Sequence, residues 1–188
     1  DITPPGYSFQ SFPRGSRGGG LAVIFKDNVV HHTSFVTNFE FEHSSFELAQ
    51  FNIVLPEETV HFFLVYRPPP NGKNKLTDAL FLQQFPDLLE LCNTTQGSSV
   101  ILGDFNIHFD RPDVPLTSKT VDLLDTFGLT QCVGNPTHEK GHIIDWLIHR
   151  SDDNIVQSTA VSSAIATDHF CVLATLNAAV PRASSVSV

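Results

Sequence analysis

The run 100-VILGDFNIHFD-110 starts as a buried strand and continues with a polar residue at every second position. Its first part, 100–102, is continuously apolar, which is typical of a strand covered on both faces. If the chain stays extended, successive side chains point to opposite faces. One face would then carry Asp104, Asn106, His108 and Asp110. This row indicates either a functional strand end or an ordinary solvated one, and the run alone leaves both interpretations open.

Five other apolar runs have the length and composition of strands. They are 21-LAVIFK-26, 46-FELAQFNIVL-55, 60-VHFFLVY-66, 143-IIDWLIH-149 and 171-CVLATL-176. The second and third are separated by the polar turn 56–58 and predict a hairpin. The hairpin ends at 67-RPPP-70, because proline cannot continue a central strand.

Two segments have helical periodicity. Residues 75–95 carry leucine and phenylalanine at helical spacing, and Pro86 should kink or split this helix. Residues 118–128 predict a second helix, with Ser118 as possible N-cap and Gly128 just past its end. Strands dominate and two helices interrupt them, which predicts an α/β sandwich.

The composition limits which classes of protein this chain can belong to. A chain of 188 residues with 41% hydrophobic residues predicts one globular domain over 1–180, followed by a linker or tail over 181–188. No apolar run is long enough to span a membrane. The net charge of −9 disfavours nucleic acid, unless a divalent cation offsets phosphate repulsion. Three cysteines without zinc or redox spacing predict a reduced, intracellular protein, and the absence of Met predicts a processed or excised piece.

Charged residues also interrupt or precede the later apolar runs. Asp145 lies inside 143–149, where a buried carboxylate needs a partner, and Asp168 and His169 come just before 171–176. Such groups could bind one or two Mg²⁺ ions through Asp and Asn oxygens, with His169 held in one tautomer by Asp145. Phosphodiester hydrolysis needs a metal, a base for water and a donor near the phosphate.

Four strings, in this order, carry a family resemblance: 66-YRPP-69, 103-GDFN-106, 144-IDWLI-148 and 167-TDH-169. Together they resemble the endonuclease/exonuclease/phosphatase superfamily from about Pro4 to Leu176. The versions 66-YRPPP-70 and 135-NPTHEKGHIIDWL-147 are similar to the endonuclease domain of LINE-type (non-LTR) retrotransposon polyproteins.

The resemblance implies a DNase-like fold, a two-sheet β-sandwich flanked by helices, with the site at one edge. It implies that Asp104 activates water, that Asp145 orients the imidazole and that His169 contacts the scissile phosphate. The remaining implied roles are Asn106 on phosphate or metal, Asp168 as outer metal ligand, Tyr66 as transition-state donor, and Tyr66, Arg67 and Thr137 as substrate contacts. His108 and Asp110 match no catalytic position.

The implied activity is a Mg²⁺-dependent DNA endonuclease, with Mn²⁺ as a possible substitute. The implied context is fusion to a reverse transcriptase and action on DNA, in the nucleus if the target is genomic. Members of the family begin with an Asn-bearing strand and a segment with a metal-binding Glu, and this chain starts downstream of both. Glu47 does not match that Glu, so the chain itself is expected to be a weak or inactive nuclease.

Other functions stay open. A phosphatase of the same superfamily shares the catalytic set, and a non-catalytic remnant or interaction domain could keep the same fold. The string 138-HEKGH-142 matches the zinc-protease pattern, but that pattern requires both histidines on one helical face. A proline before it, Gly141 inside it and the strand after it predict a loop instead.

Overall fold

A six-stranded mixed sheet forms the centre of the protein, in the strand order β3-β4-β5-β6-β8-β7. The computed structural model describes residues 3–13, 20–36, 38–162 and 167–178. The six strands are β3 (Thr33–Val36), β4 (Glu47–Val54), β5 (Thr59–Tyr66), β6 (Ser98–Asp104), β7 (Leu129–Gln131) and β8 (Asp145–Arg150). β5 and β6 run parallel, whereas the other neighbours are antiparallel.

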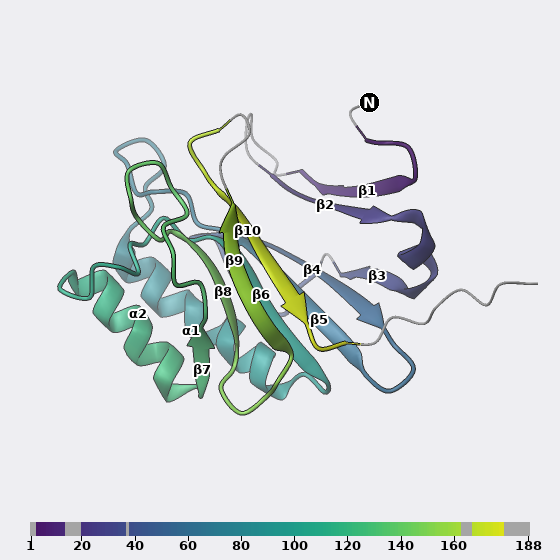
Figure 1. Ribbon diagram of the computed structural model, residues 1–188. Coiled ribbons are helices and arrows are strands. Elements are labelled where there is room, and N and C mark those ends of the chain that lie inside the picture. The colour runs from purple at the N-terminus through teal and green to yellow at the C-terminus, as the bar shows by residue number, and fades with distance from the viewer. Residues whose placement is uncertain (1–2, 14–19, 37, 163–166, 179–188) are drawn as a thin grey trace, which may run out of the picture.

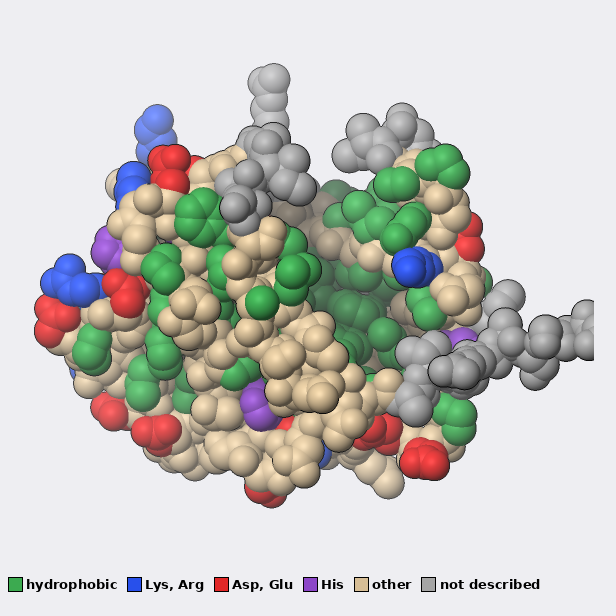
Figure 2. All heavy atoms as spheres, viewed as in Figure 1, with side chains coloured by type: hydrophobic (Ala, Val, Ile, Leu, Met, Phe, Trp, Pro, Cys, Tyr) green, Lys and Arg blue, Asp and Glu red, His purple; other side chains and the backbone are tan. Residues whose placement is uncertain are grey.

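Two smaller sheets accompany the central one. β1 (Tyr7–Phe12) pairs with β2 (Leu21–Lys26), and β9 (Val156–Ser162) pairs with β10 (Cys171–Leu176). A 3₁₀ helix, η1 (Asp27–His32), joins β2 to β3. Figure 1 shows β9 and β10 lying across β6 and β8. A mostly apolar cavity of about 410 Å³ lies between β10 and the central sheet. On the same face, Figure 2 shows a hollow lined with hydrophobic side chains between the β9–β10 part of the protein and the β1–β2 part.

The helices α1 (Asp78–Thr94) and α2 (Pro115–Thr126) lie on the other side of the sheet from β9 and β10 (Figure 1). The main core includes the fully buried side chains of Phe63, Phe81, Phe85, Leu88, Leu89, Ile101, Trp146 and Ile148. Burying each such side chain contributes about 1.5–3 kcal/mol. The predicted α/β sandwich is therefore confirmed as a mixed sheet flanked by helices.

The predicted strands are found with small changes. The runs 21–26 and 171–176 match β2 and β10, and the predicted hairpin is β4–β5. The run 143–149 becomes a strand only from Asp145, because the backbone N–H groups of Phe105 and Phe109 bond the carbonyls of the residues before it.

The helix boundaries correct two predictions. Pro86 does not split α1, because buried residues before and after it, including Phe85 and Leu88, pack into the same core. α2 begins at Pro115 rather than after Ser118. Proline suits the first turn, where its missing N–H has no helical partner. Gly128 follows the helix with φ +65°, as predicted.

No helix in the described part of the chain is long and apolar enough to cross a membrane. The predicted tail, 181–188, lies outside the described residues.

Candidate functional site

Strand register places four polar side chains in one row across β4, β5, β6 and β8. The paired residues are Glu47 with Tyr66, Tyr66 with Asp104, and Asp104 with Asp145. Directly paired residues lie on the same face of a sheet. The next row on this face is apolar, with Ala49, Leu64, Leu102 and Leu147. Titratable groups therefore collect at one end of the sheet, where β4 and β8 begin and β5 and β6 end.

The strand β6 ends at Asp104, and the polar row predicted to run on to Asp110 does not form. Asn106 has φ +48°, in the left-handed region, so the chain turns here. The Asn106 N–H donates to Asp104 Oδ1 at 2.9 Å, a local bond that stabilises such a turn. Phe105 and Ile107, on either side of this turn, are buried in the core.

The side chain of Asn106 is held by both of its amide hydrogens. Its Nδ2 donates to Asp104 Oδ2 at 3.0 Å and to the Arg67 carbonyl at 2.9 Å. With both hydrogens used, the amide carbonyl oxygen is the atom that Asn106 can offer to a cation. Asp104 and Asn106 thus form one preorganised pair of oxygen donors.

Gly103 permits the close approach of β6 to β5 beside this pair. Its φ is +146°, and a Cβ at this position would lie 1.8 Å from the Val65 carbonyl oxygen. Only glycine fits, so the first letter of the string 103-GDFN-106 has a steric cause.

Burial raises the pKa of Asp104, and the nearby negative charge of Asp145 raises it further, whereas hydrogen bonds from Asn106 and the charge of His169 oppose this shift. Two neighbouring carboxylates and a carbonyl oxygen are the donor types that Mg²⁺ and Mn²⁺ prefer. A divalent cation would relieve the repulsion between these carboxylates. The residues present therefore fit such an ion.

Asp145 and His169 form the expected pair. Nδ1 of His169 lies 2.9 Å and 3.1 Å from the two carboxylate oxygens of Asp145. Nδ1–H therefore donates to Asp145, and Nε2 is the ring atom left to act on a substrate. Burial lowers the pKa of His169, but the bond and charge of Asp145, with Asp104 and Asp168 nearby, outweigh it and raise the pKa overall.

Asp168 stands at the outer side of this pair, with 57% of its side chain exposed. Its Oδ2 lies 3.3 Å from Nε2 of His138. In the described part of the chain, His138, Asp168 and His169 form a cluster whose ligand atoms all lie within 4.8 Å of one another. The structure thus brings Asp104, Asn106, Asp145, Asp168 and His169 to one end of the sheet.

The structure contradicts the expected substrate contact of Arg67. Its side chain is only 2% exposed, and Nη2 lies 2.6 Å from Asp78. The guanidinium also lies 4.9 Å over the Phe81 ring, and Nη1 donates to the carbonyls of Phe105 and Asn106. Arg67 therefore fixes the loop after β6 from inside the protein. The sequence pattern of the hairpin did not predict the burial of Arg67, because its ion-pair partner Asp78 belongs to α1.

Thr137 is likewise buried instead of facing DNA. Its side chain has 0% exposure, and Oγ1 accepts the backbone N–H groups of Ile144 and Asp145 at 3.1 Å and 3.0 Å. This hydroxyl anchors the start of β8, so it acts on the site through the backbone of Asp145.

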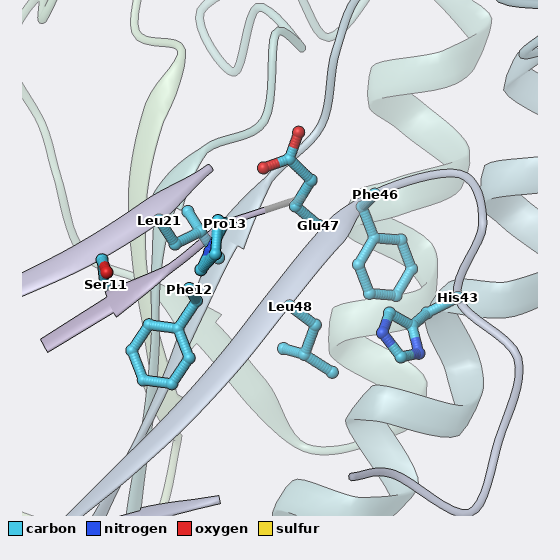
Figure 3. A pocket seen from close by; sticks show the side chains of 8 residues that line it. All are labelled: Ser11, Phe12, Pro13, Leu21, His43, Phe46, Glu47 and Leu48. Carbon is cyan, nitrogen blue, oxygen red and sulfur yellow. The ribbon is translucent and has the colours of Figure 1, made fainter. Parts of the chain in front are cut away.

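Glu47 does not match the metal-binding Glu of the family in sequence, yet register places it beside Tyr66 in the polar row. Its Oε2 accepts the Gly20 N–H at 2.9 Å. Figure 3 shows Glu47 pointing away from Phe46 and Leu48, at the rim of a cavity of about 390 Å³ between β1–β2 and β4. The predicted hairpin contained the signal for this placement, since Glu47 and Tyr66 lie at its two open ends.

His108 and Asp110 form a separate group. Asp110 accepts the Ile143 N–H at 2.8 Å and lies 2.9 Å from Nδ1 of His142. The rings of His108 and His142 stack with centroids 3.9 Å apart. These contacts tie two loops together, and 138-HEKGH-142 lies in a loop, as predicted.

Residues 2–169 match the endonuclease/exonuclease/phosphatase family, and the chain belongs to this family. Its members are hydrolases that act on phosphodiesters or phosphate esters, typically with divalent metal ions. A comparison with curated proteins finds no match.

Solved structures share the fold at low sequence identity. A 3′-5′ exonuclease (NExo) from Neisseria meningitidis is 17% identical with a TM-score of 0.65, covering 91% of this chain and 80% of that one. The human Nocturnin catalytic domain, with bound sulfate, is 16% identical with a TM-score of 0.60, covering 91% and 72%. A mannosyl-6-phosphatase from Bacteroides thetaiotaomicron is 15% identical with a TM-score of 0.53, covering 92% and 77%.

Proposed function

We propose that this chain is a Mg²⁺-dependent DNA endonuclease domain of the LINE retrotransposon type, which nicks target DNA by phosphodiester hydrolysis. The observation that carries the proposal is the juxtaposition of two preorganised pairs, Asp104 with Asn106 and Asp145 with His169, at paired strand positions. One pair offers oxygen donors and a base, and the other offers an oriented imidazole. Phosphoryl chemistry needs this combination.

Each residue has a separate task in this proposal. Asp104 accepts a proton from the attacking water, and Nε2 of His169 donates a hydrogen bond to the scissile phosphate while Asp145 holds Nδ1–H. Tyr66, beside Asp104 in the row, donates to the developing charge, and Asn106 and Asp168 supply oxygen ligands. Bound Mg²⁺, or Mn²⁺ in its place, would supply positive charge that stabilises the transition state.

DNA is favoured over a small phosphate ester by 66-YRPPP-70 and 135-NPTHEKGH-142, which resemble LINE endonucleases. A further structure of similar fold, 17% identical with a TM-score of 0.59 over 92% of this chain and 80% of that one, is the 3′ phosphatase NExo from Neisseria bound to a product DNA hairpin. In this role the chain would act beside a reverse transcriptase of the same polyprotein, on DNA in the nucleus.

Nicking of supercoiled plasmid tests the proposal. We expect relaxed product only with Mg²⁺ or Mn²⁺, and none from Asp104→Ala or His169→Ala. A parallel assay offers a 3′-phosphorylated oligonucleotide and measures released phosphate. Phosphate release without nicking would reassign the chain as a phosphatase, and neither activity at any metal concentration would leave it as a non-catalytic domain.

A further inference from the structure

The segment 137–140 pairs with 168–170 alongside the catalytic pair. The Phe170 N–H donates to the Thr137 carbonyl at 2.7 Å, and the Glu139 N–H donates to the Asp168 carbonyl at 2.9 Å. These two bonds place His138 directly opposite His169 in an isolated antiparallel bridge. The backbone thus brings a second imidazole to the site from a loop remote in sequence.

The side chain of His138 has a neighbour at each ring nitrogen. Nδ1 accepts the Lys140 N–H at 3.1 Å, so the ring proton of neutral His138 lies on Nε2. Nε2 lies 3.3 Å from Asp168 Oδ2, within ion-pair distance. The ring also meets His169 edge-on, with centroids 5.1 Å apart and planes at 81°. Only 11% of the His138 side chain is exposed, so its orientation is set by these neighbours.

The spacing of His138, Asp168 and His169 would by itself suit a transition metal. The tautomer argues against His138 as a ligand, because a neutral imidazole has one lone pair, and the Lys140 N–H already occupies it. Metal binding at Nε2 would require Nδ1 to carry a proton against that N–H. His138 therefore presents an N–H group, not a lone pair, to this cluster.

We propose that His138 is a positioning residue, which holds the Asp168 carboxylate and the His169 ring in their working orientations. Its Nε2 lies beside Oδ2 of Asp168, and its ring packs at 81° to the His169 ring, which limits rotation of that ring away from Asp145. The inference rests on the proposed function, in which Asp168 and His169 serve hydrolysis. Groups that orient metal ligands and catalytic imidazoles typically affect activity by about 10–100-fold.

The test compares His138→Ala and His138→Gln in the full chain, because Gln retains an N–H donor able to reach Asp168. His142→Ala is the matched control, since this histidine of the same loop bonds Asp110 instead. The first readout is the proton resonance of the His169 Nδ1–H, which is sharp when the bond to Asp145 is ordered. The second is the split of kcat and KM for Mg²⁺-dependent plasmid nicking.

We expect His138→Ala to broaden or lose the His169 resonance and to lower kcat about 10–100-fold at nearly constant KM. Gln should restore much of both, and His142→Ala should change neither. An unchanged resonance in His138→Ala would overturn the proposal, as would one Zn²⁺ bound per chain that this substitution abolishes. If the parent chain nicks no plasmid, the proposed function fails, whereas the resonance still decides the role of His138.

Discussion

Asp104 and Asp145 are direct cross-strand partners, at the end of the register that β6 and β8 share. Two carboxylates so placed repel each other, and the protein keeps them together with Asn106 on one side and His169 on the other. Such like-charge pairs destabilise the fold and serve cation binding or proton transfer.

The pH dependence of nicking should reflect both raised pKa values. Asp104 must be ionised as base, so activity should fall on the acid side at a pH above the usual Asp range near 3.9. In the proposed function His169 donates from Nε2 while its Nδ1–H bonds Asp145, so it acts as imidazolium, and activity should also fall as pH rises through its pKa, above the usual value of about 6.5. Asp145→Asn should move both limbs to lower pH, because it removes a negative charge that adds to the effect of burial on the pKa of Asp104 and that raises the pKa of His169. A profile of kcat/KM against pH for both proteins checks this, and unmoved limbs would contradict it.

The same shift of His169 affects stability. Because the folded state raises its pKa, the contribution of its bond to Asp145 is fully present below the unfolded pKa and is lost as pH rises through the folded pKa. Thermal unfolding of the parent and of His169→Ala should therefore give midpoints that differ most at acid pH and converge above neutrality. A difference between the two unfolding midpoints that grows with pH would contradict the bond between His169 and Asp145 as its source.

Replacing Arg67 should cost stability rather than DNA affinity. Arg67→Met leaves the carbonyls of Phe105 and Asn106 without their donor, and we expect a loss of about 2 kcal/mol in the free energy of unfolding. Arg111→Met is the control, because its bond to Asp113 is exposed and its loss should have no measurable effect. Urea unfolding measures both. If the Arg67→Met protein were stable but bound DNA more weakly, Arg67 would instead be a substrate contact.

Gly103→Ala should prevent normal pairing of β5 and β6. The added Cβ would meet the Val65 carbonyl at 1.8 Å with φ at +146°, so we expect a loss of at least about 3 kcal/mol. Gly134→Ala is the matched substitution, since nothing lies within 4 Å of its Cβ position. Circular dichroism during heating compares the two, and equal melting temperatures would show that the strands can separate at no cost.

The three cysteines should react in the order of their exposure. Burial raises the pKa of Cys92 to about 12, so its thiol should react with a disulfide reagent only on unfolding. Cys171 is exposed and should react first, followed slowly by the half-buried Cys132. Timed labelling and mass spectrometry of native protein check the order, and fast labelling of Cys92 would indicate an open core.

Local pattern was enough to predict β2, β4, β5, β6, β8 and β10, the hairpin and the partnership of Asp145, whereas it did not predict β1, β3, β7 and β9. Apolar periodicity reports which segments bury a face, and a carboxylate inside such a run needs a partner wherever the fold supplies one. The family strings added the order of the candidate residues. Both kinds of signal lie within short stretches of chain, where neighbours in sequence are neighbours in space.

Only the tertiary structure decided which groups meet. The turn at Asn106 depends on a bond to Asp104 and on the carbonyl of Arg67, so periodicity continued the strand too far. Arg67 and Thr137 turned inward because their partners, Asp78 and the start of β8, come from elsewhere in the sequence. Glu47 and His138 joined the site through strand register and a loop bridge. Contacts between remote segments are fixed by packing and hydrogen-bond satisfaction over the whole fold, which no local pattern encodes.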